Sequence, residues 1–298
     1  MKNKKCFLLF LVSLGIYLSA CQKEISVETV PLPGTVGDSN YLDKIFFLAE
    51  NGIDSEEVQT FYYDASHRLT STKDSVLDGS STGLLTENYY YSGTDTLPYK
   101  YISVDTREGF DSSIAYFFYN SQGQKITDSV REFFSSFGVS GYTGSEEVSH
   151  YKYAPGKIFG NSKNIYLLSD PQNNTEYRSD TAILDTRGNI ILSIKNGSTQ
   201  GLDGISTFTY DNSINIFTKL GITKTFPIFT TGYGIGIGNN NLLTSDEPYN
   251  GSANPFERLK GNFIYSYNSA GYPVILNFTY INDAGVSTQK LIFKYKTL

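Results

Sequence analysis

The sequence predicts an all-β protein, an antiparallel meander of hairpin repeats that forms a large curled sheet or a partly closed barrel or sandwich. Three observations support this class. A short motif recurs, in which an aromatic strand meets an Asp- or Asn-led turn and a returning strand. Tyr and Phe, with 24 and 20 copies in 298 residues, favour pleated, half-buried surfaces. Long helical periodicity is absent from the sequence. Because a sheet of many strands twists and must bury one face, we expect it to curl.

The hairpin motif explains how the turns are made. Its Asp or Asn opens a type I turn, because the side chain accepts a hydrogen bond from the backbone two residues on. A residue with positive φ then closes a three-residue hairpin with a bulge. Gly123, Gly188 and Gly271 occupy that closing place, and His67 occupies it in the first copy. Ile214 would be strained there, so we predict a different turn at residues 212–215. The copies lie at residues 61–70, 119–123, 184–188, 210–213 and 267–271.

Turn signals and alternating apolar residues place the strands in order. An Asn-Gly pair at residues 51–52 predicts a hairpin turn, and residues 151–156 form a degenerate copy of the motif with Pro155 in the turn. In the late strands Leu276 and Phe278 share one face and Asn277 lies on the other. The predicted strands cover residues 42–49, 58–63, 68–74, 87–91, 99–105, 114–119, 124–134, 181–184, 189–195, 206–210, 215–220, 263–267, 273–280 and 289–295.

The N-terminus has the pattern of a secretory signal peptide. A basic start with three lysines precedes an apolar run over residues 7–18, which is far shorter than the roughly 20 apolar residues of a spanning helix. Leu18-Ser19-Ala20-Cys21 closes the run and resembles the lipobox of bacterial lipoproteins, in which the cysteine is acylated. The resemblance implies removal of residues 1–20 and lipid attachment at Cys21. An ordinary signal peptide with a chance cysteine is the alternative.

The rest of the chain is predicted to be a tether and one domain. Residues 21–40 carry two prolines and two glycines without apolar periodicity, so we expect a lipid anchor and a flexible tether. No clear linker interrupts residues 41–298, the predicted all-β hairpin-repeat domain. Because Cys6 lies in the signal peptide, Cys21 would be the only cysteine of the mature chain, which leaves no disulfide and no thiol nucleophile.

The charge of the chain disfavours one class of partner. The net charge of −6 becomes −9 when three lysines leave with the signal peptide. Contacts to phosphates need clustered Lys and Arg, so such an acidic chain is a poor candidate for binding nucleic acid.

Candidate chemistry is sparse. His67 lies in a predicted turn and His150 on a predicted strand, and we expect a structural or solvent-exposed role for each. No Gly-x-Ser-x-Gly nucleophile elbow is present. Adjacent acids on a strand point to opposite faces and make no acid–base pair; such pairs are Glu56 and Glu57, Glu146 and Glu147, and Asp246 and Glu247. We therefore predict no enzyme activity, no catalytic residue, no metal ligand and no cofactor.

A glycine-rich stretch at residues 232–238 resembles a nucleotide loop only superficially. Cradling a phosphate needs a following helix, and Asn239-Asn240-Asn241 follows instead, without helical patterning. We interpret the stretch as a strand or loop of small residues on which another segment packs closely. The rim of a binding site is the alternative interpretation.

The hairpins resemble the YD-type repeats of bacterial cell-surface proteins. The lipobox, the Asn-rich stretch at residues 238–241 and the late motif at residues 265–273 together resemble Bacteroidetes-type outer-membrane lipoproteins. The acidic residues after Cys21 resemble their export tags. This resemblance implies a lipid-anchored protein of the outer membrane, with exposure at the cell surface left open.

These observations lead to one functional expectation and two alternatives. We expect a non-enzymatic binding or scaffold role at the membrane, with the ligand and the oligomeric state open. The first alternative is recognition of a glycan or a peptide through exposed Tyr and Phe. The second, less favoured, is a hydrolase. An exposed aromatic strip would favour the first alternative, and a cleft holding a histidine beside carboxylates would favour the second.

Overall fold

The computed structural model describes residues 40–48, 55–76, 83–106, 111–133, 142–168, 174–196, 204–220, 238–248, 258–282 and 285–298. The predicted signal peptide, Cys21, the tether, the turn at residues 51–52 and most of the glycine-rich stretch lie outside these residues. No helix within the described ranges is long and apolar enough to cross a membrane.

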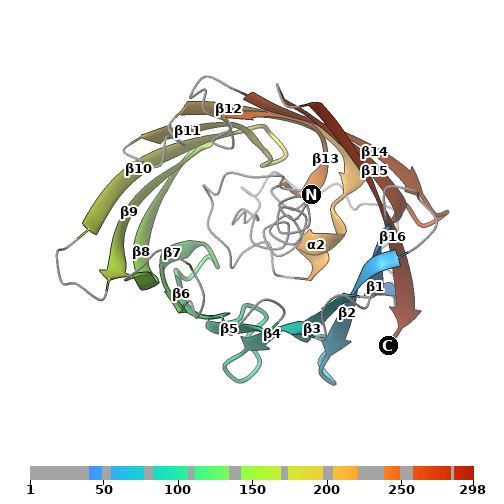
Figure 1. The fold of residues 1–298 in the computed structure, drawn as a ribbon, viewed down its shortest axis with the longest axis horizontal. Helices are drawn as coiled ribbons and strands as arrows, with labels where there is room; N and C mark the ends of the chain where they lie inside the picture. Colours follow the sequence, from blue (N-terminus) through green and yellow to red (C-terminus); the bar gives the residue numbers. More distant parts are fainter. Residues whose placement is uncertain are drawn as a thin grey trace.

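The described residues form a closed barrel of sixteen strands, each antiparallel to the next and the last paired with the first (Figure 1). The strands are β1 (Asn40–Leu48), β2 (Ser55–Tyr63), β3 (Leu69–Val76), β4 (Leu84–Tyr90), β5 (Lys100–Asp105), β6 (Asp111–Tyr119), β7 (Lys125–Phe133), β8 (Tyr142–Ala154), β9 (Lys157–Leu168), β10 (Asn174–Leu184), β11 (Ile190–Asn196), β12 (Gly204–Ile214), β13 (Asn240–Pro248), β14 (Arg258–Tyr267), β15 (Pro273–Asn282) and β16 (Gly285–Thr297).

The predicted all-β antiparallel meander is confirmed, with one error among the predicted strands. Residues 215–220 were predicted as a strand, but a single helical turn, α2 (Ile216–Lys219), occupies them. The side chain of Asn215 accepts a hydrogen bond from the backbone N–H of Phe217 at 3.0 Å, which caps the turn. Figure 1 shows α2 inside the ring of strands, where Ile216 and Phe217 are buried.

The predicted turn chemistry is also confirmed. Asp64 Oδ1 accepts hydrogen bonds from the backbone N–H groups of Ser66 and Arg68, both at 2.9 Å, and Asn120, Asp185 and Asn268 repeat this pair of bonds. The closing residues have φ between 62° and 84°. Asp211 differs, as predicted: its Oδ1 accepts from Ser213 and from Asn241 on β13.

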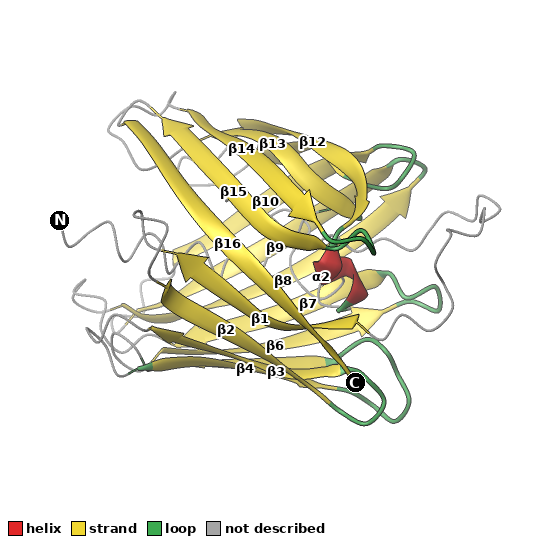
Figure 2. Cartoon of the chain, turned by 90° about the vertical axis from the view of Figure 1, so that its right-hand side faces the viewer, coloured by secondary structure: helices red, strands yellow, loops and turns green. Residues whose placement is uncertain are grey.

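The tight connections that the structure describes in full lie at one end of the barrel, which we call the turn rim (Figure 2). β1 begins and β16 ends at this rim. The tight connections cover residues 64–68, 91–99, 120–124, 155–156, 185–189 and 268–272.

Six tyrosines at the rim ends of their strands make the same hydrogen bond. Tyr63 donates a hydrogen bond from its hydroxyl to the carbonyl of Leu42 at 2.7 Å, across to the start of the neighbouring strand. The bond ties each hairpin to the one before it, and burial raises the pKa of the Tyr63 phenol above its usual range. Equivalent bonds join Tyr91 to Leu69, Tyr119 to Pro98, Tyr153 to Lys125, Tyr210 to Ile190, and Tyr295 to Pro273.

The inner wall has two zones. Near the turn rim it is apolar, with Phe61, Phe117 and Phe263 among the buried side chains of one continuous core. Farther from the rim, the inward residues of β2 to β13 are mostly polar; we call this part the polar zone. Its buried residues include Glu57, Gln59, Asp74, Glu87, Asp128, Glu176, Asp180, Lys195 and Glu247.

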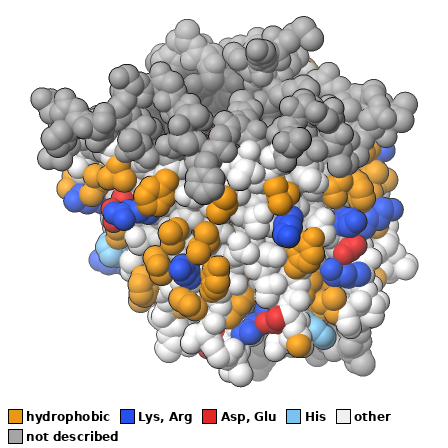
Figure 3. Space-filling model, turned by 60° about the horizontal axis from the view of Figure 1, so that its bottom comes forward, with side chains coloured by type: hydrophobic (Ala, Val, Ile, Leu, Met, Phe, Trp, Pro, Cys, Tyr) orange, Lys and Arg blue, Asp and Glu red, His pale blue; other side chains and the backbone are white. Residues whose placement is uncertain are grey.

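The outer wall mixes apolar and charged side chains. Large exposed residues such as Tyr116 and Ile264 alternate with the buried ones along their strands. Exposed Lys73 and Lys163 lie within β3 and β9 rather than at their ends. Figure 3 shows hydrophobic side chains lying around separate Lys and Arg side chains on this wall.

Candidate functional site

One row of outward side chains crosses seven neighbouring strands. Tyr90 on β4 is the direct cross-strand partner of Lys100 on β5, which is the partner of Tyr116 on β6. The pairing continues through Ser129 and Val148 to Lys163 on β9 and Tyr177 on β10. We call these seven residues the Tyr–Lys row. The Nζ atom of Lys100 lies 5.5 Å from the ring centroids of both Tyr90 and Tyr116, within cation–π range.

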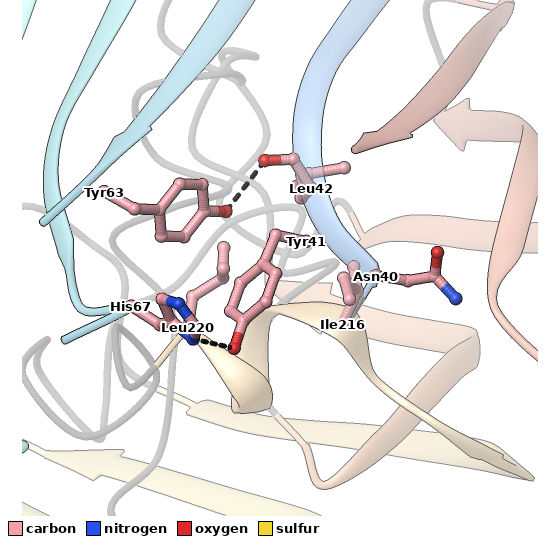
Figure 4. A pocket seen from close by; sticks show the side chains of 7 residues that line it. All are labelled: Asn40, Tyr41, Leu42, Tyr63, His67, Ile216 and Leu220. Atoms are coloured by element: carbon pink, nitrogen blue, oxygen red, sulfur yellow. Dashed lines mark hydrogen bonds between the residues drawn. The ribbon is translucent and has the colours of Figure 1, made fainter. Parts of the chain in front are cut away.

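A cavity of about 180 Å³ lies at the turn rim, between the start of β1, the β2–β3 turn and α2 (Figure 4). The ring of Tyr41 packs edge-on against Tyr63 and against His67, with centroids 5.3 and 5.2 Å apart. The Tyr41 hydroxyl and His67 Nδ1 are hydrogen-bonded at 2.9 Å. The lining residues are Asn40, Tyr41, Leu42, Tyr63, His67, Ile216 and Leu220.

The backbone of His67, which lines this rim cavity, has an unusual conformation. Among the described non-glycine residues, His67 alone has a left-handed backbone, with φ of 62°, where three other repeats place glycine. Such a conformation costs a non-glycine residue roughly 1 kcal/mol, and the contacts of the imidazole with Tyr41 offset that cost. The described lining contains an imidazole, two phenols and an amide, but no carboxylate to form an acid–base pair with His67.

The polar zone contains a second group of charged side chains, from β8, β10, β11 and β13. Burial raises the pKa of Asp180 to about 6, against the opposing positive charges of Lys195 and Arg178. Burial lowers the pKa of Lys195 to about 8, against the opposing negative charges of Asp180 and Glu247. Burial also raises the pKa of Glu147. Within the described ranges, no group of three or more His, Asp or Glu residues could hold a metal ion.

One fully buried ion pair lies where the two inner zones meet. Lys125 Nζ is 2.6 Å from Asp128 Oδ2, and the two side chains are 0% and 1% exposed. The Tyr151 hydroxyl donates to the same carboxylate oxygen at 2.9 Å. The Nζ atom also lies 5.0 Å from the Tyr151 ring and 5.7 Å from the Phe117 ring. These contacts compensate the desolvated charges and give the pair a structural role.

The structure separates the two histidines. His67 lines the rim cavity, whereas His150 is exposed on the outer wall of β8 and is hydrogen-bonded to Thr127 Oγ1 at 3.1 Å. The expectation of structural or solvent-exposed roles agrees with these positions. The two histidines therefore contribute to no common site.

The adjacent acids point to opposite faces, as predicted. Glu146 lies on the outer wall, where Arg131 Nη2 is 3.0 Å from its carboxylate, and Glu147 faces the polar zone. Asp246 pairs outward with Arg258, and Glu247 is buried. The side chain of Glu56 lies outside the described residues, so the third pair stays a prediction.

Close packing is confirmed at Gly238, the described end of the glycine-rich stretch. A Cβ atom there would lie 2.4 Å from Tyr210 Cε1 and 2.8 Å from Asn189 Oδ1. The asparagines that follow bind across strands: Asn240 exchanges two hydrogen bonds with Asn189, at 2.9 and 3.0 Å. This segment holds neighbouring hairpins together at the turn rim.

Sequence reasoning missed the charged residues of the polar zone. Glu176, Arg178 and Asp180 precede the predicted strand at residues 181–184, and no strand bounds were predicted for the regions of β8, β9 and β13. The alternation of charges at every second position from 176 to 180 was the signal that could have placed them on one face.

Comparison with known proteins yields similarities of fold. No protein-family model matches the sequence, and no curated protein shows significant similarity to it. A structure described as a porin-like protein from Bacteroides vulgatus has a TM-score of 0.49 and 12% identity, over 87% of this chain and 100% of its own. A porin-like protein from Bacteroides uniformis has a TM-score of 0.41 and 15% identity, over 86% and 98%.

Proposed function

We propose that the protein is a lipid-anchored protein of the bacterial outer membrane, with a non-enzymatic binding or scaffold role, whose barrel stands outside the bilayer. The lipobox-like sequence before Cys21 supports the anchor. The main observation in support of a barrel outside the bilayer is the presence of charged side chains on its outer wall.

The outer wall is a poor match to hydrocarbon. Lys73 and Lys163 are exposed well inside their strands, and exposed Asn262 and Asn277 lie at the middle of β14 and β15. A lysine facing lipid near the bilayer midplane costs roughly 2–4 kcal/mol. In water, none of these side chains has such a cost. The wall therefore supports a barrel surrounded by water, held to the membrane by its acyl chains.

The interior supports the same proposal. The inner wall of a membrane channel is polar along its length, whereas here the zone near the turn rim is a continuous apolar core that includes α2. An apolar lining of this kind suits a scaffold or a binding surface better than an aqueous channel.

The test is fractionation of cells that express Cys21→Ala. We expect the wild-type protein in the membrane fraction and the variant in the soluble fraction without detergent. Cys6→Ala is the matched control, because Cys6 lies in the signal peptide and its loss leaves the anchor intact. Membrane attachment of Cys21→Ala that withstands alkaline carbonate would contradict both the anchor and the position of the barrel.

The structure bears differently on the two alternatives. Recognition of a glycan or peptide is one form of the proposed binding role, and the exposed rings of the Tyr–Lys row favour it. A hydrolase has no comparable support, because the described lining of the rim cavity places no carboxylate beside His67. We therefore do not propose catalysis.

A further inference from the structure

The Tyr–Lys row combines two kinds of group that bind sugars and acids. Tyr90, Tyr116 and Tyr177 are 40%, 42% and 66% exposed, so each ring presents apolar area and a hydroxyl to water. Exposed aromatic rings of this kind are typical of binding surfaces, since they supply contact area at little entropic cost. The two lysines lie between the rings in the same row.

The cations of the row have no ionic partner within the described ranges. Neither Lys100 nor Lys163 forms a salt bridge there, whereas neighbouring Arg131 is paired with Glu146. The row is therefore a locally positive strip on a chain whose net charge is −6. This contrast favours an anionic ligand that the strip attracts and the rest of the surface repels.

The spacing of the row suits a linear polymer. Neighbouring strands are about 4.8 Å apart, so Tyr90 and Tyr116 lie about 10 Å apart, and Tyr116 and Tyr177 about 19 Å apart. Lys100 and Lys163 are also four strands apart. The shorter distance is close to the length of one disaccharide in an extended polysaccharide, and the longer ones are close to two.

A second, mostly polar row of outward residues lies beside the Tyr–Lys row, two positions along each strand toward the turn rim. Phe118 is paired with Thr127, Thr127 with His150, His150 with Asn161, and Asn161 with Ser179. These hydroxyl, imidazole and amide groups can donate to and accept from the hydroxyls of a sugar chain lying along the Tyr–Lys row.

We infer that the Tyr–Lys row binds a linear acidic polysaccharide, whose sugar rings stack on the tyrosines and whose carboxylates or sulfates pair with Lys100 and Lys163. This inference rests on the proposed binding role and gives it a ligand class. It is independent of the lipid anchor, because it concerns only the outer wall of β4 to β10.

The experiment measures retardation of the whole protein, purified in non-ionic detergent, in gels that contain alginate, chondroitin sulfate, dextran or single-stranded poly(dT). Binding to alginate or to chondroitin sulfate, with none to dextran, supports the inference. Alginate carries carboxylates alone and chondroitin sulfate carries carboxylates and sulfates, so stronger binding to chondroitin sulfate would show that sulfate contributes. We expect Lys100→Gln and Tyr116→Ala each to weaken binding about fivefold or more, while Tyr116→Phe retains it. Thermal melting checks that each variant is folded.

Matched controls lie on β14, across the barrel. Lys260→Gln removes an exposed lysine and Ile264→Ala an exposed apolar side chain, and both should bind as the wild type does. Equal weakening by Lys260→Gln would mean diffuse charge attraction and would overturn the inference. Wild-type binding by Tyr116→Ala, failure of both polyanions, or tighter binding of poly(dT) would also overturn it. Failure of the anchor shows only in fractionation, so the two proposals fail separately.

Discussion

Removing the positive charge of the buried Lys125–Asp128 pair should be among the most damaging single changes in the barrel. Lys125→Met keeps most of the side-chain volume and deletes the ammonium group 2.6 Å from Asp128 Oδ2. The carboxylate would then remain buried, with the Tyr151 hydroxyl still bound to Oδ2. In the described part of the chain Asp128 Oδ1 already has no hydrogen-bond partner.

The magnitude follows from the burial of both groups. Breaking a buried ion pair by removing one partner costs about 3–5 kcal/mol. A loss of 1 kcal/mol lowers the Tm of a domain of this size by roughly 2–4 °C, so we expect Lys125→Met to lower the Tm by about 10 °C. Adding Asp128→Asn removes the stranded charge and keeps an acceptor for Tyr151. The double variant should recover at least half of the loss.

Circular dichroism melts of the purified protein measure these changes. The matched control is Arg131→Met, which breaks the exposed pair with Glu146 and should cost less than about 1 kcal/mol. A shift of about 2 °C corresponds to less than about 1 kcal/mol. If the Tm of Lys125→Met lies within that shift of the wild-type Tm, or is no lower than the Tm of Arg131→Met, the reasoning from buried charge is refuted.

Two further predictions concern other polar contacts. Asn189 is fully buried, and its side chain is hydrogen-bonded to Asp185 and Asn240. Asn189→Ala should lower the free energy of unfolding by about 2–3 kcal/mol, because it leaves these groups unpaired. Urea unfolding measures this change, and an unchanged midpoint would argue against the network. Burial raises the pKa of Asp180 to about 6, above its value in the unfolded chain, so the folded protein binds the extra proton and this carboxyl's contribution to stability falls as pH rises from about 4 to 6. The free energy of unfolding of the wild type, relative to that of Asp180→Asn, should therefore fall over that interval. A relative free energy that rises with pH would contradict this prediction.

The hairpins could be predicted because their causes are local. An Asx residue and a closing residue such as Gly271 or His67 fix each turn within five positions of the chain. The alternation around Leu276 likewise fixes the faces of a strand without knowledge of the rest of the fold.

Closure, the missing strands and the candidate site have non-local causes. Pairing of β1 with β16 brings together residues about 250 positions apart, which no local pattern encodes. β8 and β9 turn polar residues inward, because a wide barrel has an interior that is not all apolar core, so the rule that inward means apolar failed there. The Tyr–Lys row depends on register across seven strands, and α2 interrupts the repeat where Ile214 replaces glycine.

The closed ring has a consequence for the chain after its synthesis. A sheet with a first and a last strand would offer two rows of unpaired backbone groups to other chains, flanked here by many aromatic side chains. Joining the two ends leaves no such template for aggregation, but only once the C-terminal strand has arrived. A chain that loses its final segment would expose both edges at once, so intact synthesis to the last strand protects this protein from self-association.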